Sequence, residues 1–175
     1  MKRIISIALL ILFVFQLQGQ EKKSPKKIKV SGDYIHSETE TNFPELFENY
    51  KRIDVYSFDK KDKNIGVTYE NETNDKKTTL SIYIYPTEEA SEDRLRNEYF
   101  NSMQSIAYIS KNGINATQKL IKKVGEKYIC NGIKAEMKND KNEITQLLLF
   151  ECGTWFYKIR LSTNELDSIQ IEDIE

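Results

Sequence analysis

The stretch Thr78-Thr79-Leu80-Ser81-Ile82-Tyr83-Ile84-Tyr85-Pro86 is the clearest strand in this sequence. Its apolar residues Leu80, Ile82 and Ile84 alternate with hydroxyl-bearing side chains, and a period of two is typical of a strand with one buried face. Proline lacks the backbone N–H that a sheet ladder needs, so we expect the strand to end at Pro86. The segments on either side decide what kind of sheet this strand joins.

Two stretches before this strand show the same alternation. Residues 53–58 and 65–70 each place apolar and polar side chains on opposite faces, which predicts two further strands. The polar segments 59–64 and 71–77 separate the three strands, and we expect both to be turns or loops. Pro44 predicts the first turn of a short helix, because its missing N–H would be unpaired there anyway.

The segment after the strand changes to a helical period. Thr87 can cap a helix, and Gly113 supplies the left-handed residue that commonly ends one. We therefore expect one helix of about 22 residues, long but within the range of globular proteins. The side chains expected to face the sheet recur every three or four residues and are Leu95, Tyr99, Met103, Ile106 and Ser110.

The last third of the chain returns to strands. Alternation predicts strands within residues 118–124, 127–138, 143–152 and 154–161, and a short terminal helix follows residue 162. Residues 147–150 are apolar on both faces, which indicates a central strand covered from both sides. The order strands, long helix, strands, short helix predicts an α+β fold, with a mostly antiparallel sheet and the long helix packed on one face.

The two cysteines lie on two of these expected strands. If Lys141 is the centre of the turn between them, residues whose numbers total 282 lie opposite one another, which pairs Cys130 with Cys152 and Gly132 with Phe150. An even cysteine count in an exported protein favours a disulfide, here a structural staple because no Cys-x-x-Cys motif is present. The alternative is a pair of buried free thiols.

The N-terminus has the features of an export signal. Two basic residues precede an apolar run over residues 4–15, and Gly19 offers a small residue for cleavage. The run is shorter than the roughly 20 residues that span a membrane, although an uncleaved anchor is the alternative. No cysteine lies near the cleavage point, so we expect no lipoprotein attachment. The predicted organisation is a signal peptide over 1–19, a basic flexible tail over 20–33 and one domain over 34–175. We expect a periplasmic or secreted protein with no transmembrane anchor after cleavage.

Charge limits the classes of partner. Removal of residues 1–19 takes two basic residues and leaves 24 basic against 27 acidic side chains in the exported chain. This balance argues against nucleic acid as a partner, because phosphate binding requires a basic surplus. Residues 21–29 contain five lysines, which is typical of a solvated tail, although such a run can also contact an anionic membrane or polysaccharide.

Catalytic and metal-binding motifs are sparse. His36 is the only histidine, which excludes a multi-histidine metal site, and we interpret it as an exposed polar residue. The pattern Asp62-x-Asn64-x-Gly66 resembles the start of a calcium loop but places glycine where a ligand is required, so we interpret it as a turn. The sequence therefore predicts no metal site, no cofactor and no catalytic residue.

Tyrosine is the side chain most suited to binding in this chain. There are ten tyrosines, and tyrosine is enriched at binding surfaces because it combines a large apolar ring with a polar hydroxyl. Tyr83 and Tyr85, together with Tyr99 and Tyr108, are the candidate ligand-binding residues. The alternative is that these rings pack beneath a helix or loop.

Four short segments carry a family resemblance. Phe43-Pro44-Glu45, Tyr50-Lys51-Arg52, Val67-Thr68-Tyr69 and Ile82-Tyr83-Ile84-Tyr85-Pro86 look like segments of small uncharacterised exported bacterial proteins. With the order hairpin, helix, meander, the chain also resembles the PsbP-like α/β sandwich over about two thirds of its length. The resemblance implies a binding or accessory role and no catalytic residues.

The sequence favours an exported, non-catalytic binding or accessory domain whose partner is a protein, peptide or glycan of the cell envelope. One alternative is a small hydrolase-type enzyme with an unrecognised carboxylate site or a site built from Cys130 and His36. Another is an envelope-associated inhibitor or accessory protein that acts through its basic tail. A pocket with converging ionisable groups would favour the enzyme, and an exposed surface lined by tyrosine would favour binding.

Overall fold

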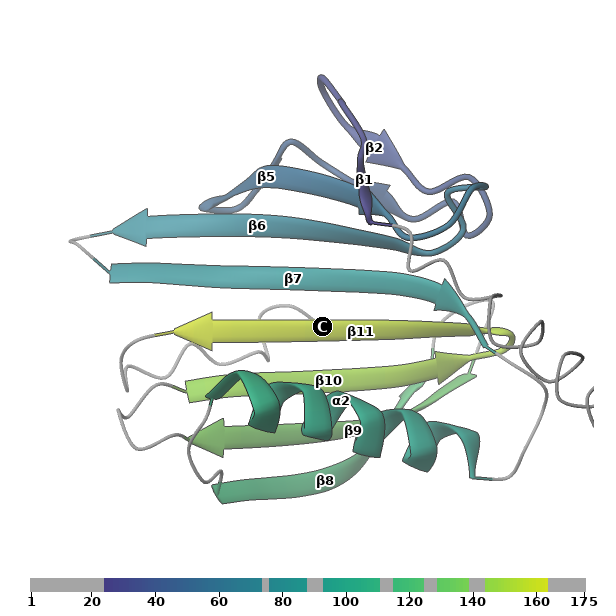
Figure 1. Ribbon diagram of the computed structural model, residues 1–175, viewed down its shortest axis with the longest axis vertical. Helices are drawn as coiled ribbons and strands as arrows, with labels where there is room; N and C mark the ends of the chain where they lie inside the picture. The colour runs from purple at the N-terminus through teal and green to yellow at the C-terminus, as the bar shows by residue number, and fades with distance from the viewer. Residues whose placement is uncertain are drawn as a thin grey trace, which may run out of the picture.

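A single antiparallel sheet dominates the fold (Figure 1). The computed structural model describes residues 24–73, 76–87, 93–110, 115–124, 129–138 and 144–163. Nine strands form the sheet in the order β1-β5-β6-β7-β11-β10-β9-β8, with β4 also paired to β5, and β2 and β3 form a separate two-stranded sheet. The strands are β1 (Lys26–Lys27), β2 (Tyr34–Ile35), β3 (Asn42–Phe43), β4 (Leu46–Phe47), β5 (Tyr50–Ser57), β6 (Ile65–Thr73), β7 (Lys76–Pro86), β8 (Asn115–Val124), β9 (Ile129–Lys138), β10 (Ile144–Cys152) and β11 (Trp155–Thr163).

One helix, α2 (Arg94–Ser110), carries the chain from the middle of the sheet to its far edge. The chain leaves β7, passes through α2 and re-enters the sheet at β8, four places away in the strand order. Strands β9, β10 and β11 then return one by one, until β11 pairs with β7. In Figure 1, α2 lies in front of β9 and β10, and no helix of the described residues lies in front of β5, β6 and β7.

The predicted α+β class is wrong, because the fold is mostly β. The part of the chain that the structure describes contains one helix of 17 residues, shorter than the expected one. The terminal helix expected after residue 162 lies outside the described residues, apart from residues 162 and 163, which belong to β11. The physical reason is that strand pairing extends through polar residues, where the sequence lacks the alternation that predicts a strand.

The hairpin of β6 and β7 shows this extension most clearly. Residues 71–77 were expected to form a polar loop, yet the ladder continues to the pair Thr73 and Lys76. Lys77 Nζ lies 2.7 Å from Glu70 Oε1, so opposite charges on neighbouring strands replace apolar contacts.

The prediction of a helix that begins at Pro44 is also wrong, because Pro44 lies between the short strands β3 and β4. Its carbonyl accepts a hydrogen bond of 2.9 Å from the Tyr69 hydroxyl.

Helix α2 covers an apolar cluster on one face of the sheet. Its residues Tyr99 and Ile106 are buried in this cluster, and Leu95 and Met103 pack against it, as their spacing predicts. The sheet side chains in the cluster come from β9, β10 and β11 and are Ile133, Ala135, Met137, Leu147, Leu149 and Phe156. This face of the sheet is called the helix face below.

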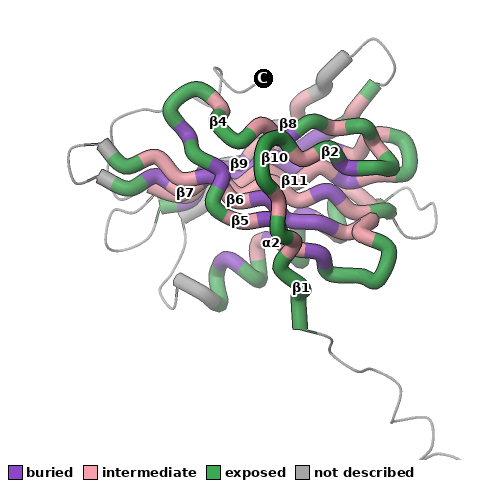
Figure 2. The backbone as a smooth tube through the Cα atoms, turned by 90° about the horizontal axis from the view of Figure 1, so that it is seen from above, coloured by how far each residue is buried: buried purple, intermediate pink, exposed green. Residues whose placement is uncertain are grey.

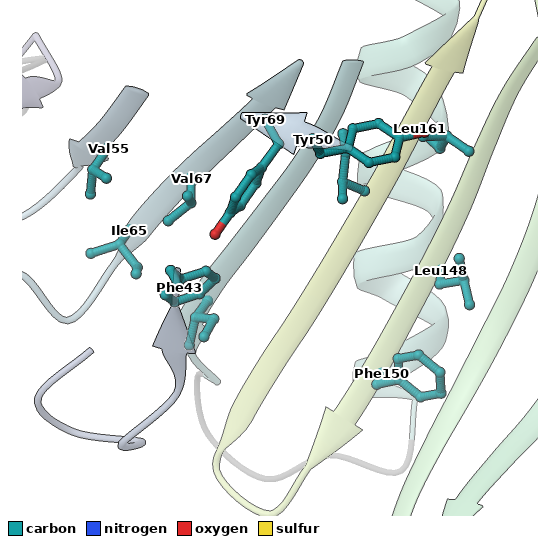
Figure 3. Close-up of a cluster of buried hydrophobic side chains, with 11 residues drawn as sticks. Phe43, Tyr50, Val55, Ile65, Val67, Tyr69, Leu148, Phe150 and Leu161 are labelled. Atoms are coloured by element: carbon teal, nitrogen blue, oxygen red, sulfur yellow. The ribbon is translucent and has the colours of Figure 1, made fainter. Parts of the chain in front are cut away.

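The opposite face carries a larger cluster, covered by residues 28–50 (Figure 3). Phe43 and Tyr50 contribute rings to it, with Ile28 and Val30 packed alongside. Residues 26–30, predicted to belong to a flexible basic tail, lie against the sheet here: β1 pairs with β5, and the Ile28 N–H donates to the Val55 carbonyl at 2.8 Å. Buried positions alternate with less buried ones along the strands, as Figure 2 shows.

Strand β10 is apolar on both faces, as predicted. Leu147 and Leu149 are buried in the helix-face cluster, whereas Leu148 and Phe150 are buried in the cluster beneath residues 28–50. The predicted register with β9 is confirmed, because Phe150 lies opposite Gly132. The sulfur atoms of Cys130 and Cys152, two positions further along the hairpin, are 2.05 Å apart, the distance of a disulfide bond.

Candidate binding surface

The helix face continues beyond α2 over strands β5, β6, β7 and β11. In one row across these strands, Tyr56 lies opposite Gly66, Gly66 opposite Tyr83, and Tyr83 opposite Lys158. Paired residues share a face, and Lys158 is paired with Leu149 of the helix-face cluster. The next row across the same strands consists of Asp54, Thr68, Ser81 and Arg160. We call these two rows, together with Phe58, the open surface.

Gly66 leaves room for two aromatic rings, those of Tyr83 and Phe58, which we call the aromatic platform. A Cβ atom at Gly66 would be 3.0 Å from two carbons of the Tyr83 ring and 3.1 Å from the Phe58 ring. The Tyr83 and Phe58 ring centroids are 6.3 Å apart, within the range of interacting aromatic pairs. Phe58 is 42% exposed and Tyr83 is half-buried. The platform is thus supported from below by glycine and is accessible from above.

Lys158 connects the platform to the helix. Its Nζ lies 5.4 Å from the Tyr83 ring centroid and 5.2 Å from that of Tyr85, both within cation–π range. The same atom is 3.5 Å from Glu98 Oε1 on α2. This acceptor also receives hydrogen bonds from the Tyr85 hydroxyl at 2.6 Å and from the Ser102 hydroxyl at 3.3 Å. Glu98 is therefore shared by several donors, which weakens its hold on the ammonium group.

The Tyr85 hydroxyl is held in its protonated form. Burial, and then the hydrogen bond to the Glu98 carboxylate, raise the pKa of Tyr85 above its ordinary value. A hydroxyl with a raised pKa stays protonated near neutral pH, so it donates a hydrogen bond to the carboxylate and is not available as a general base. The contact between Tyr85 and Glu98 therefore positions α2 on the sheet and does not suit acid–base chemistry near neutral pH.

The structure does not bring the four candidate tyrosines together. Tyr83 and Tyr85 are neighbours on the same face of β7, at the border between α2 and the open surface. Tyr99 is buried in the cluster beneath α2. Tyr108 lies near the end of the helix and is 88% exposed. Only Tyr83 belongs to the open surface.

His36 is buried, so its interpretation as an exposed residue is wrong. Its exposed fraction is 0%, and its ring packs edge-on against Trp155 with the centroids 5.4 Å apart. Nδ1 is 2.7 Å from the Thr39 hydroxyl, whereas Nε2 has no hydrogen-bond partner among the residues that the structure describes. Burial lowers the pKa of His36, which favours the neutral ring. The polar residues around His36 in the sequence suggested that it is exposed. Packing against Trp155, which is distant in the sequence, buries it instead.

A nucleophilic site built from Cys130 and His36 is not supported by the described contacts. Cys130 and Cys152 are paired with each other, so neither offers a free thiolate as a nucleophile. In the described part of the chain, no group of three or more His, Cys, Asp or Glu side chains is placed to hold a metal ion. The Asp62 segment is a turn in which the Asp59 carboxylate accepts hydrogen bonds from the backbone N–H groups of Lys61, Lys63 and Asn64.

Two cavities lie beside the N-terminal edge of the sheet. One, of about 240 Å³, lies between residues 27–30 and β5, and another, of about 300 Å³, lies between Lys26 and the turn after β5. Both are lined by charged side chains of mixed sign, and Phe58 is the one open-surface side chain shared with the second cavity. No described helix is long and apolar enough to cross a membrane.

The basic residues of the open surface were missed from the sequence. The alternation that predicts a strand over residues 154–161 places Trp155, Tyr157, Ile159 and Leu161 together on one face. The same period places Lys158 and Arg160 together on the other face, next to Phe156. The sequence therefore contained the signal for a basic pair on one face, although only the sheet order shows that Tyr83 lies beside Lys158.

The chain matches no protein-family model and no curated protein.

Proposed function

We propose that this protein is an exported, non-catalytic binding domain whose ligand lies on the open surface. The observation that carries the proposal is the Tyr83 ring packed over Gly66, with Phe58 beside it and the Lys158 ammonium 5.4 Å from its centroid. Aromatic rings and cations held in place by a sheet bind a ligand with little loss of side-chain entropy.

Export is supported by the signal-like N-terminus and by the cysteine pair, because disulfides persist in oxidising compartments. The disulfide is part of the proposal as a staple between β9 and β10 and not as a redox centre. The resemblance to the PsbP-like sandwich and to small exported bacterial proteins supports a non-enzymatic role by analogy alone.

The proposal is tested by probing a glycan array and a peptide array with the purified, labelled protein. We expect at least one ligand to bind, and the Tyr83→Ser variant to lose most of that signal. Tyr108→Ser is the matched control, because it removes an equally large ring from a site at the end of α2. A signal unchanged by Tyr83→Ser, or no signal from the parent protein, would overturn the proposal.

A further inference from the structure

The unpaired charge on the open surface is positive. Asp54 forms an ion pair with Lys27, so its carboxylate is already matched by a cation. Arg160 has no ion-pair partner among the residues that the structure describes, and Lys158 has only its 3.5 Å contact with the shared carboxylate of Glu98. Lys158 and Arg160 are two residues apart on one strand, which places their Cα atoms about 7 Å from each other on the same face. The surface therefore complements a ligand that carries negative charge.

The groups around these cations are hydroxyls and rings. Ser81 lies directly opposite Arg160, and Thr68 lies opposite Ser81 on the next strand. Tyr83 and Phe58 provide ring surface beside Lys158. Hydroxyls exchange hydrogen bonds with ligand hydroxyls in either direction, because each is both donor and acceptor. Ring faces contact the apolar C–H groups of a sugar.

The sheet geometry disfavours a peptide on this surface. Extended peptides usually bind by adding a strand to an exposed edge, where backbone N–H and C=O groups are free. The open surface is a face of paired strands, and the backbone groups of β6 and β7 are already engaged in the ladder. Recognition must then use side chains alone, and those present are cations, hydroxyls and aromatic rings.

We infer that the ligand of the open surface is a carboxylate-bearing saccharide, with its acidic groups on Arg160 and Lys158 and a sugar face against Tyr83 and Phe58. This inference rests on the proposed function and names the class of its ligand. The planar guanidinium of Arg160 matches a carboxylate with two parallel hydrogen bonds.

The test compares a hexasaccharide of galacturonic acid with its methyl ester by titration calorimetry. The two probes have the same sugar units and differ in charge. We expect the acid to bind at least tenfold more tightly, and Arg160→Gln to weaken its binding about tenfold, the loss of one charge-assisted contact. Lys134→Gln is the matched control, because Lys134 lies on the opposite face of the sheet, paired with Leu148.

The outcomes separate the inference from the proposed function. If the ester binds as tightly as the acid and Tyr83→Ser weakens both, the surface binds saccharides but the inferred carboxylate recognition is wrong. If hexaglutamate binds as tightly as the acid, the saccharide class is wrong. If neither hexasaccharide binds, the inference fails, and the array experiment decides the proposed function separately. Thermal unfolding of each variant identifies any loss of binding that is due to misfolding.

Discussion

The buried imidazole of His36 makes the stability of the protein depend on pH. Its pKa is lowered by burial, so the unfolded chain takes up a proton at a higher pH than the folded chain does. The backbone of Asp62 and Lys63 and the carboxylates of Glu38 and Asp59 oppose this effect, but burial is the larger influence. Stability is therefore complete above the ordinary histidine pKa of about 6.5 and falls as the pH drops below it.

We predict that the free energy of unfolding falls between pH 7.5 and pH 5.5, by at most about 1.4 kcal/mol per pH unit for one proton. Urea unfolding followed by Trp155 fluorescence measures this loss, and Trp155 is the only tryptophan and contacts His36. The His36→Phe variant is the control, because it keeps an aromatic ring and removes the only imidazole. An equal loss in this variant would assign the effect to other groups.

Gly66 and Gly132 each lie beneath an aromatic ring, and the two rings differ in how far they can move to make room for a side chain. At Gly66, an added Cβ would meet the Tyr83 ring, which is only partly buried and can move outward. At Gly132, it would be 2.6 Å from the buried Phe150 ring and 2.9 Å from the Leu149 carbonyl oxygen, which belongs to the neighbouring strand. The second site has no room to relax.

We predict that Gly132→Ala lowers the free energy of unfolding by about 2–3 kcal/mol, as for other overpacked sites. Gly66→Ala should stay within about 1 kcal/mol of the parent protein, because alanine also restricts the unfolded chain more than glycine does. Denaturant unfolding of the two variants measures the difference. Equal losses at the two sites would show that the buried ring is as mobile as the exposed one.

At the scale of elements, the cysteine pair joins β9 to β10. The two residues are separated by 22 positions along the chain, so a bond between them closes a loop that is open in the reduced, unfolded chain. Restricting a loop of this size is worth about 3 kcal/mol. The bond lies beyond the last ladder pair, Glu151 with Asn131, and holds the end of the hairpin together.

We predict that the Cys130→Ala/Cys152→Ala variant loses about 3 kcal/mol of stability and keeps its fold. Ligand binding at the open surface should be unaffected, because the cysteines lie on the opposite face. Thiol titration of the unfolded, unreduced protein provides the direct check, and two reactive thiols would contradict the pairing. Lys134→Gln, on the same hairpin, serves as a control for stability changes unrelated to the bond.

At the scale of the whole molecule, Arg52 attaches the N-terminal residues to the sheet. Its guanidinium is buried and donates to the carbonyls of Phe43 and Gly32, which lie in the segment that covers the sheet. Its backbone N–H donates to the Glu45 carbonyl at 2.9 Å. Nearby, burial raises the pKa of Tyr69 to about 12, so its hydroxyl stays protonated and donates to Pro44.

We predict that Arg52→Met lowers the free energy of unfolding by at least about 2 kcal/mol, because two carbonyls near the core lose their donors. The exposed Lys51→Met change on the same strand is the control, and it should be nearly neutral. Hydrogen exchange should show faster exchange in residues 28–50 of the Arg52 variant than in β9 and β10. If protection from exchange were lost equally across the whole sheet, residues 28–50 would not open separately from it.

Much of the strand pattern was predictable from local sequence. The faces of β7, the two-sided burial of β10 and the register of β9 with β10 follow from alternation and from one turn position. Most of the α2 stripe also follows from its spacing. The fold class was not predictable in this way, because polar segments such as residues 71–77 join strands only through pairing with a partner strand.

The candidate site was predicted less well than the strands. Tyr83 was correctly placed on the face opposite Leu80 and Ile84, but its neighbours Lys158 and Phe58 come from other parts of the chain. Tyr99 fits a binding residue by composition, yet it is buried in the core. A side chain's role depends on what packs over it, which local sequence does not record.

The sequence by itself determined where the alternating parts of the strands lie, because a period of two depends only on neighbouring residues. It also determined which residues on each strand share a face. Tertiary structure alone decided that α2 covers the cluster on β9 and β10 and leaves Tyr83 partly exposed, and that the buried His36 ring packs against Trp155. These outcomes depend on contacts between segments far apart in the chain. The free energies of such contacts cannot be read from a local sequence pattern.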